Sequence, residues 1–158
     1  MQDITPLNEN DNIGGLETIE FALVTDIASI PDAAGMQVPT GVVMNTGKRF
    51  YKAPVTLESA IFAETGSDSE HGTSYDKSVS GFCPCDNNEN AALFDEMENA
   101  RFIVKVKDNS GRKRLVGTIA EPLQFKIDRS TQQSTAETPG VTISFFGKGL
   151  KQSPFYDL

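Results

Sequence analysis

Two cysteines separated by a single residue are the most conspicuous candidates for chemistry in this chain of 158 residues. Cys83-Pro84-Cys85 stands just before a predicted helix, a position where redox-active thiols often lie. Redox pairs usually have two intervening residues, however, and a zinc site needs four ligands where only His71 and carboxylates remain. A disulfide closed across one residue would be strained. We therefore predict two reduced, partly buried thiols with no bound metal.

The other ionisable residues show no catalytic arrangement. His71 is the only histidine and has no serine–base–acid pattern around it, so we expect it to be exposed. A helix is predicted to carry Asp95, Glu96 and Glu98 on its solvent-exposed face, rather than as a general acid/base pair. The segment Gly66–Gly72 is acidic and lacks the Gly-Lys-Ser/Thr ending of a phosphate-binding loop. We expect no catalytic, cofactor-binding or metal-binding residue, and a protein that is not an enzyme.

The net charge limits the partners of the chain. A formal charge of −8 argues against a domain that binds duplex DNA, which would carry a basic face. Arg112-Lys113-Arg114 is basic, but three such residues after a turn are usually solvated. The chain has no Trp, and its Phe and Tyr residues are spread at core spacing rather than as a stacking platform. We expect no sequence-specific nucleic acid partner.

The charges are unevenly distributed along the chain. Residues 1–100 contain 17 Asp/Glu and four Lys/Arg, a net charge of −13, whereas residues 101–158 contain five and ten, a net charge of +5. Both sets can be solvated faces. Alternatively, an acidic surface and a basic surface meet head to tail between copies of the protein.

Length and hydropathy favour a globular domain. A chain of 158 residues, 38% hydrophobic and 23% charged, is long enough to form one core. No run approaches the ~18 apolar residues of a membrane span, and the first residues lack the basic and apolar regions of a secretory signal. We expect residues 1–15 to be a flexible arm and residues 16–158 a single β domain. We expect it to be made in the cytoplasm, with no membrane partner.

One helix and one hairpin follow the cysteines. Apolar residues recur at helical spacing over 89–99, and Asn87 or Asn88 can cap the first turn. Alternating apolar and polar residues then predict a strand hairpin over 101–119, closed by the turn at Asp108-Asn109-Ser110-Gly111.

Alternating patterns predict six further strands. They lie at about residues 17–24, 38–44, 50–63, 75–81, 123–127 and 141–146. The polar segments 64–74 and 128–140 are predicted as mobile surface loops. About eight antiparallel strands result, joined by turns too short for crossover helices. The predicted fold is mainly β, a β-sandwich or rolled barrel with one flanking α-helix near 89–99.

This order of elements resembles the tail-tube family of bacteriophages and its relatives in contractile injection machines. The C-terminal part is also similar to small prophage-type proteins of Bacteroidetes, through Asn109–Thr118, Pro122-Leu123, Gly140–Phe145 and Pro154-Phe155-Tyr156. The resemblance implies a structural virion protein whose copies form rings by adding strands between subunits, and whose rings stack into a tube. It implies other tail proteins as partners, and a location in the bacterial cytoplasm and then in the virion. It carries over no functional residue.

The resemblance also indicates which surfaces would matter. The predicted loops 64–74 and 128–140 would contact neighbouring subunits or stacked rings, the N-terminal arm would clamp an adjacent copy, and an acidic bore would repel DNA phosphates. Two alternatives remain. One is a tail terminator or connector ring, which polymerises only once. The other is a monomeric β-sandwich module that binds a carbohydrate or peptide, although Tyr51, Tyr75 and Tyr156 do not cluster in the sequence.

Overall fold

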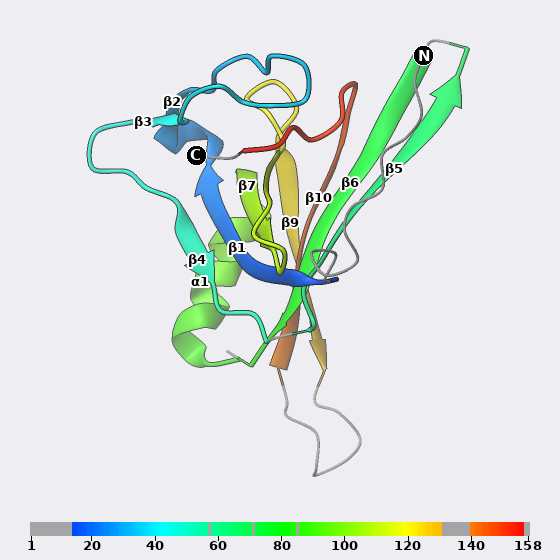
Figure 1. Cartoon of the computed structure of the whole chain (residues 1–158). Coiled ribbons are helices and arrows are strands. Elements are labelled where there is room, and N and C mark those ends of the chain that lie inside the picture. Colours follow the sequence, from blue (N-terminus) through cyan, green and yellow to red (C-terminus); the bar gives the residue numbers. More distant parts are fainter. Residues whose placement is uncertain (1–13, 57, 71, 85, 131–139, 157–158) are drawn as a thin grey trace.

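A computed structural model gives the fold of the chain. It describes residues 14–56, 58–70, 72–84, 86–130 and 140–156. The residues 1–13 of the predicted arm, most of the predicted loop at 128–140, and His71 and Cys85 lie outside these ranges. Within them the chain forms ten strands and one α-helix, so the predicted mainly β, sandwich-like fold with one helix is confirmed (Figure 1).

Eight strands form one antiparallel sheet. Its path runs β4-β1-β7-β9-β10-β6-β5, and β8 pairs with β7 beside it. The strands are β1 (Leu16–Leu23), β4 (Tyr51–Ala53), β5 (Ile61–Ser69), β6 (Gly72–Cys83), β7 (Arg101–Asp108), β8 (Lys113–Val116), β9 (Leu123–Ser130) and β10 (Gly140–Gly149). A short 3-10 turn, η2 (Val24–Asp26), leads to a two-stranded sheet of β2 (Ile27–Ser29) and β3 (Val43–Met44).

The sheet separates two hydrophobic cores. Successive residues of a strand point to opposite faces, and β7 is buried on both. Phe102 and Val104 of β7 enter the larger core, where the ring of Phe102 packs edge-on against Phe145 of β10 at 5.5 Å between centroids. Ile103 enters a smaller core with Leu115 of β8. The segment 24–50 and the end of the described chain cover this smaller core.

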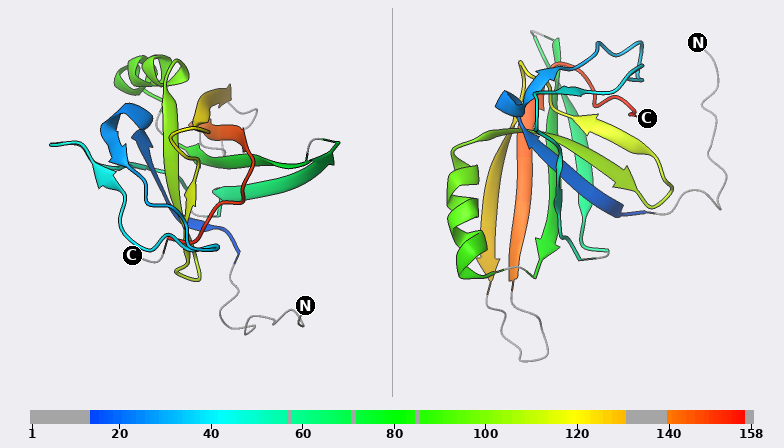
Figure 2. Two further views of the ribbon diagram at one scale, coloured as in Figure 1. Left: turned by 90° about the horizontal axis from the view of Figure 1, so that it is seen from above. Right: turned by 90° about the vertical axis from the view of Figure 1, so that its left-hand side faces the viewer.

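The predicted helix is α1 (Asn88–Glu98), which lies against β9 (Figure 2). Asn87 caps it as predicted, because its side-chain oxygen accepts a hydrogen bond from the backbone N–H of Asn90 at 2.8 Å. Phe94 and Met97 form the buried side of the helix, and the Phe94 ring stacks on Phe125 of β9 at 5.9 Å. Helical spacing therefore identified the face that packs on the sheet.

Several predicted boundaries are wrong. The predicted loop at 64–74 is instead the outer part of a long β5–β6 hairpin. The two described ends of the predicted loop at 128–140 are strand, since β9 continues to Ser130 and β10 begins at Gly140. Of the predicted strand 38–44, only β3 forms. The glycine, serine and acidic residues of 64–74 suggested a loop. Pairing with β6 nevertheless holds β5 extended, because tertiary pairing overrides the weak intrinsic preference of these residues for a strand.

The predicted strand 50–63 is divided into β4 and β5. The backbone N–H of Thr56 donates to the carbonyl of Phe82 at 2.8 Å, so the chain leaves β4 and crosses to β6 before β5 begins. Gly81 of β6 permits this crossing, because a Cβ at this position would lie 2.7 Å from Cγ1 of Val55. Leu16 N–H also donates to the carbonyl of Ala60 at 3.2 Å. β1 therefore lies beside the residue that precedes β5, which is at the opposite end of the strand order.

Candidate functional site

Cys83 is the first of the residues singled out for chemistry. It is buried at the end of β6 and is disulfide-bonded, so the prediction of a reduced thiol is wrong for this residue.

The carboxylates of α1 are exposed, as predicted. Asp95 and Glu98 line an open groove of about 480 Å³ between α1 and β9, whose other lining residues are Ala91, Ile127 and Arg129. The groove is open to solvent and has acidic and basic groups on its rim. No three His, Cys, Asp or Glu side chains among the described residues are grouped so that they could hold a metal ion.

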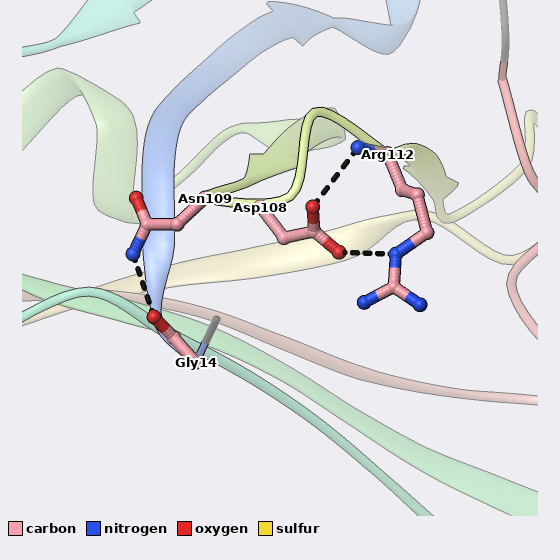
Figure 3. Close-up of polar contacts among 4 residues, drawn as sticks. All are labelled: Gly14, Asp108, Asn109 and Arg112. Atoms are coloured by element: carbon pink, nitrogen blue, oxygen red, sulfur yellow. Dashed lines mark hydrogen bonds and ion pairs between the residues drawn. The ribbon is translucent and has the colours of Figure 1, made fainter. Parts of the chain in front are cut away.

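The basic run 112–114 is largely engaged within the subunit. The Arg112 side chain donates from Nε to Asp108 Oδ2 at 2.9 Å, and its backbone N–H donates to Asp108 Oδ1 at 2.9 Å (Figure 3). Asn109 of the same turn donates to the carbonyl of Gly14 at 2.6 Å. Arg114 donates to the carbonyl of Ser153 at 2.9 Å. These residues therefore stabilise the β7–β8 turn and its surroundings.

The fold brings together much of the charge that the sequence separates. Four ion pairs join acidic residues from 1–100 to basic residues from 101–158. They are Glu20–Lys105 at 2.6 Å, Glu17–Lys107 at 2.5 Å, Asp86–Arg129 at 3.6 Å and Asp76–Lys148 at 3.2 Å. The first two form because antiparallel pairing places β1 beside β7. Much of the basic half is thus neutralised inside one subunit, and the unpaired charge is concentrated elsewhere.

In the described part of the chain, no strand pairs with the outer edge of β5. β5 is the last strand of the sheet, and it has nine residues paired with β6 in an unbroken register from Ile61–Ser80 to Ser69–Gly72. Among the described residues, Ala60 is the last to bond toward β1 before the strand begins. Figures 1 and 2 show the far half of the β5–β6 hairpin extending away from the rest of the sheet.

The sequence of β5 lacks several of the devices that block an edge. Natural proteins protect such edges with short strands, proline, charged side chains (lysine above all) or bulges. β5 is long, contains no Pro, Lys or Arg, and pairs with β6 without a bulge. Its charged residues are Glu64 and Asp68. An edge of this kind is a template for pairing with another chain.

The opposite end of the sheet is β4, whose outer edge is also open in the described part of the chain. β4 pairs on one side with β1, Tyr51 lying opposite Phe21. Tyr51 is 40% exposed, and the guanidinium of Arg49 lies 5.3 Å from its ring centroid. Segment 45–56 contains no Asp or Glu and carries Lys48, Arg49 and Lys52. This edge is therefore basic, whereas the β5 edge is acidic.

A third edge, that of β8, is covered by the chain itself. Residues 150–156, here named the C-terminal strap, run back from β10 to β8. Leu115 N–H donates to the carbonyl of Pro154 at 3.0 Å, and Tyr156 N–H donates to that of Lys113 at 2.9 Å. The Tyr156 side chain is buried in the smaller core, where its hydroxyl accepts from Val42 N–H at 3.1 Å.

Two carboxylates hold the strap to the base of the hairpin. Oε2 of Glu64 accepts from the backbone N–H and the hydroxyl of Ser153, at 2.9 and 2.6 Å. The two oxygens of Glu121 accept from Leu150 N–H at 3.1 and 3.2 Å. Beside them lies Lys77 of β6, which is only 5% exposed. Burial lowers the pKa of Lys77 below its usual value of 10.5, whereas the charges of Glu64 and Glu121 act in the opposite direction.

Sequence reasoning missed this cluster. The alternation along 75–81 does place Lys77 on the same face of its strand as the buried Val79. A lysine is rarely buried without a charged partner, so this position was the one signal of the cluster in the sequence. Glu121 comes from the turn before β9, and only the folded chain brings it to Gly149, where a Cβ would lie 2.8 Å from Glu121 Oε2. The three tyrosines do not converge either, since Tyr51 lies on β4, Tyr75 on the hairpin and Tyr156 in the smaller core.

No helix in the described ranges is both long and apolar enough to cross a bilayer. Comparisons with protein-family models, with curated proteins and with solved structures find no match to this chain.

Proposed function

We propose that this protein is a structural virion protein of a phage or prophage tail, whose copies assemble into rings or a tube through strand edges and loops. The observation that carries the proposal is the β5 edge, which has nine residues and with which no strand pairs in the described part of the chain. An exposed edge of this length would be a liability for a protein that acts alone, because it invites uncontrolled pairing. It is useful in a protein whose purpose is to pair with its own copies.

The projecting hairpin supports the same proposal. The outer half of β5–β6 is exposed on both faces, so its residues contribute little to the core of their own subunit. Pairs such as Ser67 and Ser74, whose hydroxyls lie 3.1 Å apart, stabilise it locally. A hairpin that is held extended in this way can reach a neighbouring subunit or a stacked ring.

Assembly can be tested directly on the purified full chain. We expect sedimentation velocity to show concentration-dependent association, and negative-stain images to show rings or tubes. The variant Thr65→Lys places a charge on the exposed outer face of β5 and should reduce association at least tenfold. Gln124→Lys adds the same charge to an exposed position of β9, away from the edge, and should leave association unchanged.

The images also separate the proposal from its alternatives. A single closed ring that never stacks would favour a terminator or connector over a tube protein. A monodisperse monomer at every protein and salt concentration would overturn the proposal and would favour a monomeric binding module.

A further inference from the structure

We propose that the β5 edge of one copy pairs antiparallel with the β4 edge of the next copy, in a head-to-tail contact that places Arg49 opposite Glu64. The inference rests on the proposed self-assembly and names the two surfaces that perform it. In the described part of the main sheet, β4 and β5 are the two ends of the strand order, and both have an open outer side. β8 is excluded because the C-terminal strap covers it.

Charge selects β4 rather than a second β5 as the partner. From Ile61 to Glu70 the charged residues are all acidic, whereas from Asn45 to Thr56 they are all basic. Symmetric pairing of two β5 strands in full overlap would place Glu64 opposite Gly66, and the registers on either side would place it opposite itself or Asp68. Such a pair of strands gathers four carboxylates, and like charges directly opposite are destabilising. Pairing of β5 with β4 brings opposite charges together instead.

The faces of the two strands fix the register. Tyr51 points to the side of the sheet that contains Phe21, and Phe62 of β5 points to the same side, packing partly against the larger core. An antiparallel register with Tyr51 opposite Phe62 makes an aromatic cross-strand pair. The same register puts Arg49 opposite Glu64 and, on the other face, Lys52 opposite Ile61.

The groups involved are accessible for this contact. Ile61 is 57% exposed and Tyr51 is 40% exposed, so both side chains are accessible to a partner. Arg49 contacts the Tyr51 ring. Glu64 is half-buried and bonds Ser153 through Oε2, so the proposed contact with Arg49 uses Oε1. Because the two edges belong to different ends of the sheet, the contact is heterologous and generates a ring or an open filament.

Cysteine cross-linking tests the pairing. Residues directly opposite in an antiparallel pair are close enough for a disulfide. We expect a disulfide-linked dimer when Lys52→Cys and Ile61→Cys proteins are mixed and oxidised, and no such dimer from either variant alone or from the unmodified chain. Thr65→Cys alone should also remain uncross-linked, because it would form a dimer only if two β5 edges paired.

A charge variant gives an independent measurement. Arg49→Glu should weaken self-association at least tenfold, because it places two carboxylates opposite each other, while Arg49→Lys should retain most of it. Arg49 has little role inside the subunit, so the thermal midpoint of either variant should match that of the parent chain.

Each outcome has a distinct meaning. Cross-linking of Thr65→Cys alone, or particles in the images without any cross-link in the Lys52→Cys and Ile61→Cys mixture, would overturn the β4–β5 pairing and leave self-assembly standing. A monomer in every experiment would overturn both proposals. Equal association of Arg49→Glu and the parent chain would also refute the assigned register.

Discussion

The outer edges of β8 and β5 differ in whether another segment of the chain covers them. β8 has four residues, and the C-terminal strap bonds along its outer side and buries Tyr156 beneath it. β5 has nine residues, and its outer side is open. The strap passes the base of the hairpin, where Glu64 holds it, and then continues to β8. A covering segment therefore lies next to both edges but closes only the shorter one, which supports a role for the longer one outside the subunit.

Removal of the cover from β8 should have the largest effect on stability. Tyr156→Ala removes a buried ring and leaves Val42 N–H without its acceptor, so the free energy of unfolding should fall by about 3–5 kcal/mol. Tyr51→Ala, at the open β4 edge, should cost only about 1 kcal/mol because its ring is partly exposed already. Urea denaturation of both variants measures the difference. Equal losses would show that the two edges are not distinguished in this way.

The strap's attachment to Glu64 should have an intermediate effect. Ser153→Ala removes the hydroxyl that donates to the carboxylate at 2.6 Å, in a site with no solvent exposure. We expect a loss of about 1–2 kcal/mol and faster hydrogen exchange at Leu115 and Tyr156, whose amides bond the strap to β8. Lys151→Ala, at an exposed position of the strap, should change neither quantity. Unchanged exchange in Ser153→Ala would mean that the strap is held without Glu64.

The smallest expected effect is the change in unfolding free energy with pH that Lys77 causes. Its pKa in the folded chain is lowered from 10.5, first by burial, so between the folded value and 10.5 the unfolded chain binds a proton that the folded chain does not. Stability from this group therefore rises with pH in that window and is constant above it. The difference in unfolding free energy between the parent chain and Lys77→Met should increase with pH over this range. A difference that is flat or falls with pH would contradict the assignment.

Local signals predicted part of the fold. The helix follows from its apolar spacing and the Asn87 cap, and the β7–β8 hairpin from the turn at Asp108–Gly111. These interactions are made between neighbours in sequence, so they are visible in it. The outer half of β5 was not predicted, because its composition is that of a loop and only pairing with β6 makes it a strand.

The sequence shows no recognisable catalytic pattern, which led us to expect a protein that acts through its surfaces. It does not show where those surfaces lie, because which edges are unpaired depends on contacts between distant segments. The path of the strap across β8 and the meeting of Glu64, Lys77 and Glu121 are examples. The uneven distribution of charge along the sequence suggested separate acidic and basic surfaces. The pairing of β1 with β7 instead joins Glu20 to Lys105 and Glu17 to Lys107 within one subunit.

The position of β1 between β4 and β7 has a consequence for the order of folding. β1 pairs with residues far along the chain, as in Phe21 opposite Val104, which are 83 positions apart. The paired strands β5 and β6, and likewise β9 and β10, are close to each other in the sequence. We therefore expect these hairpins to form early and the insertion of β1 to limit the rate, on the order of milliseconds to seconds as in other β-rich topologies. During that interval the β5–β6 hairpin would already be able to pair with another copy of the chain. The rate at which β1 inserts would therefore decide whether folded subunits assemble or incompletely folded chains aggregate.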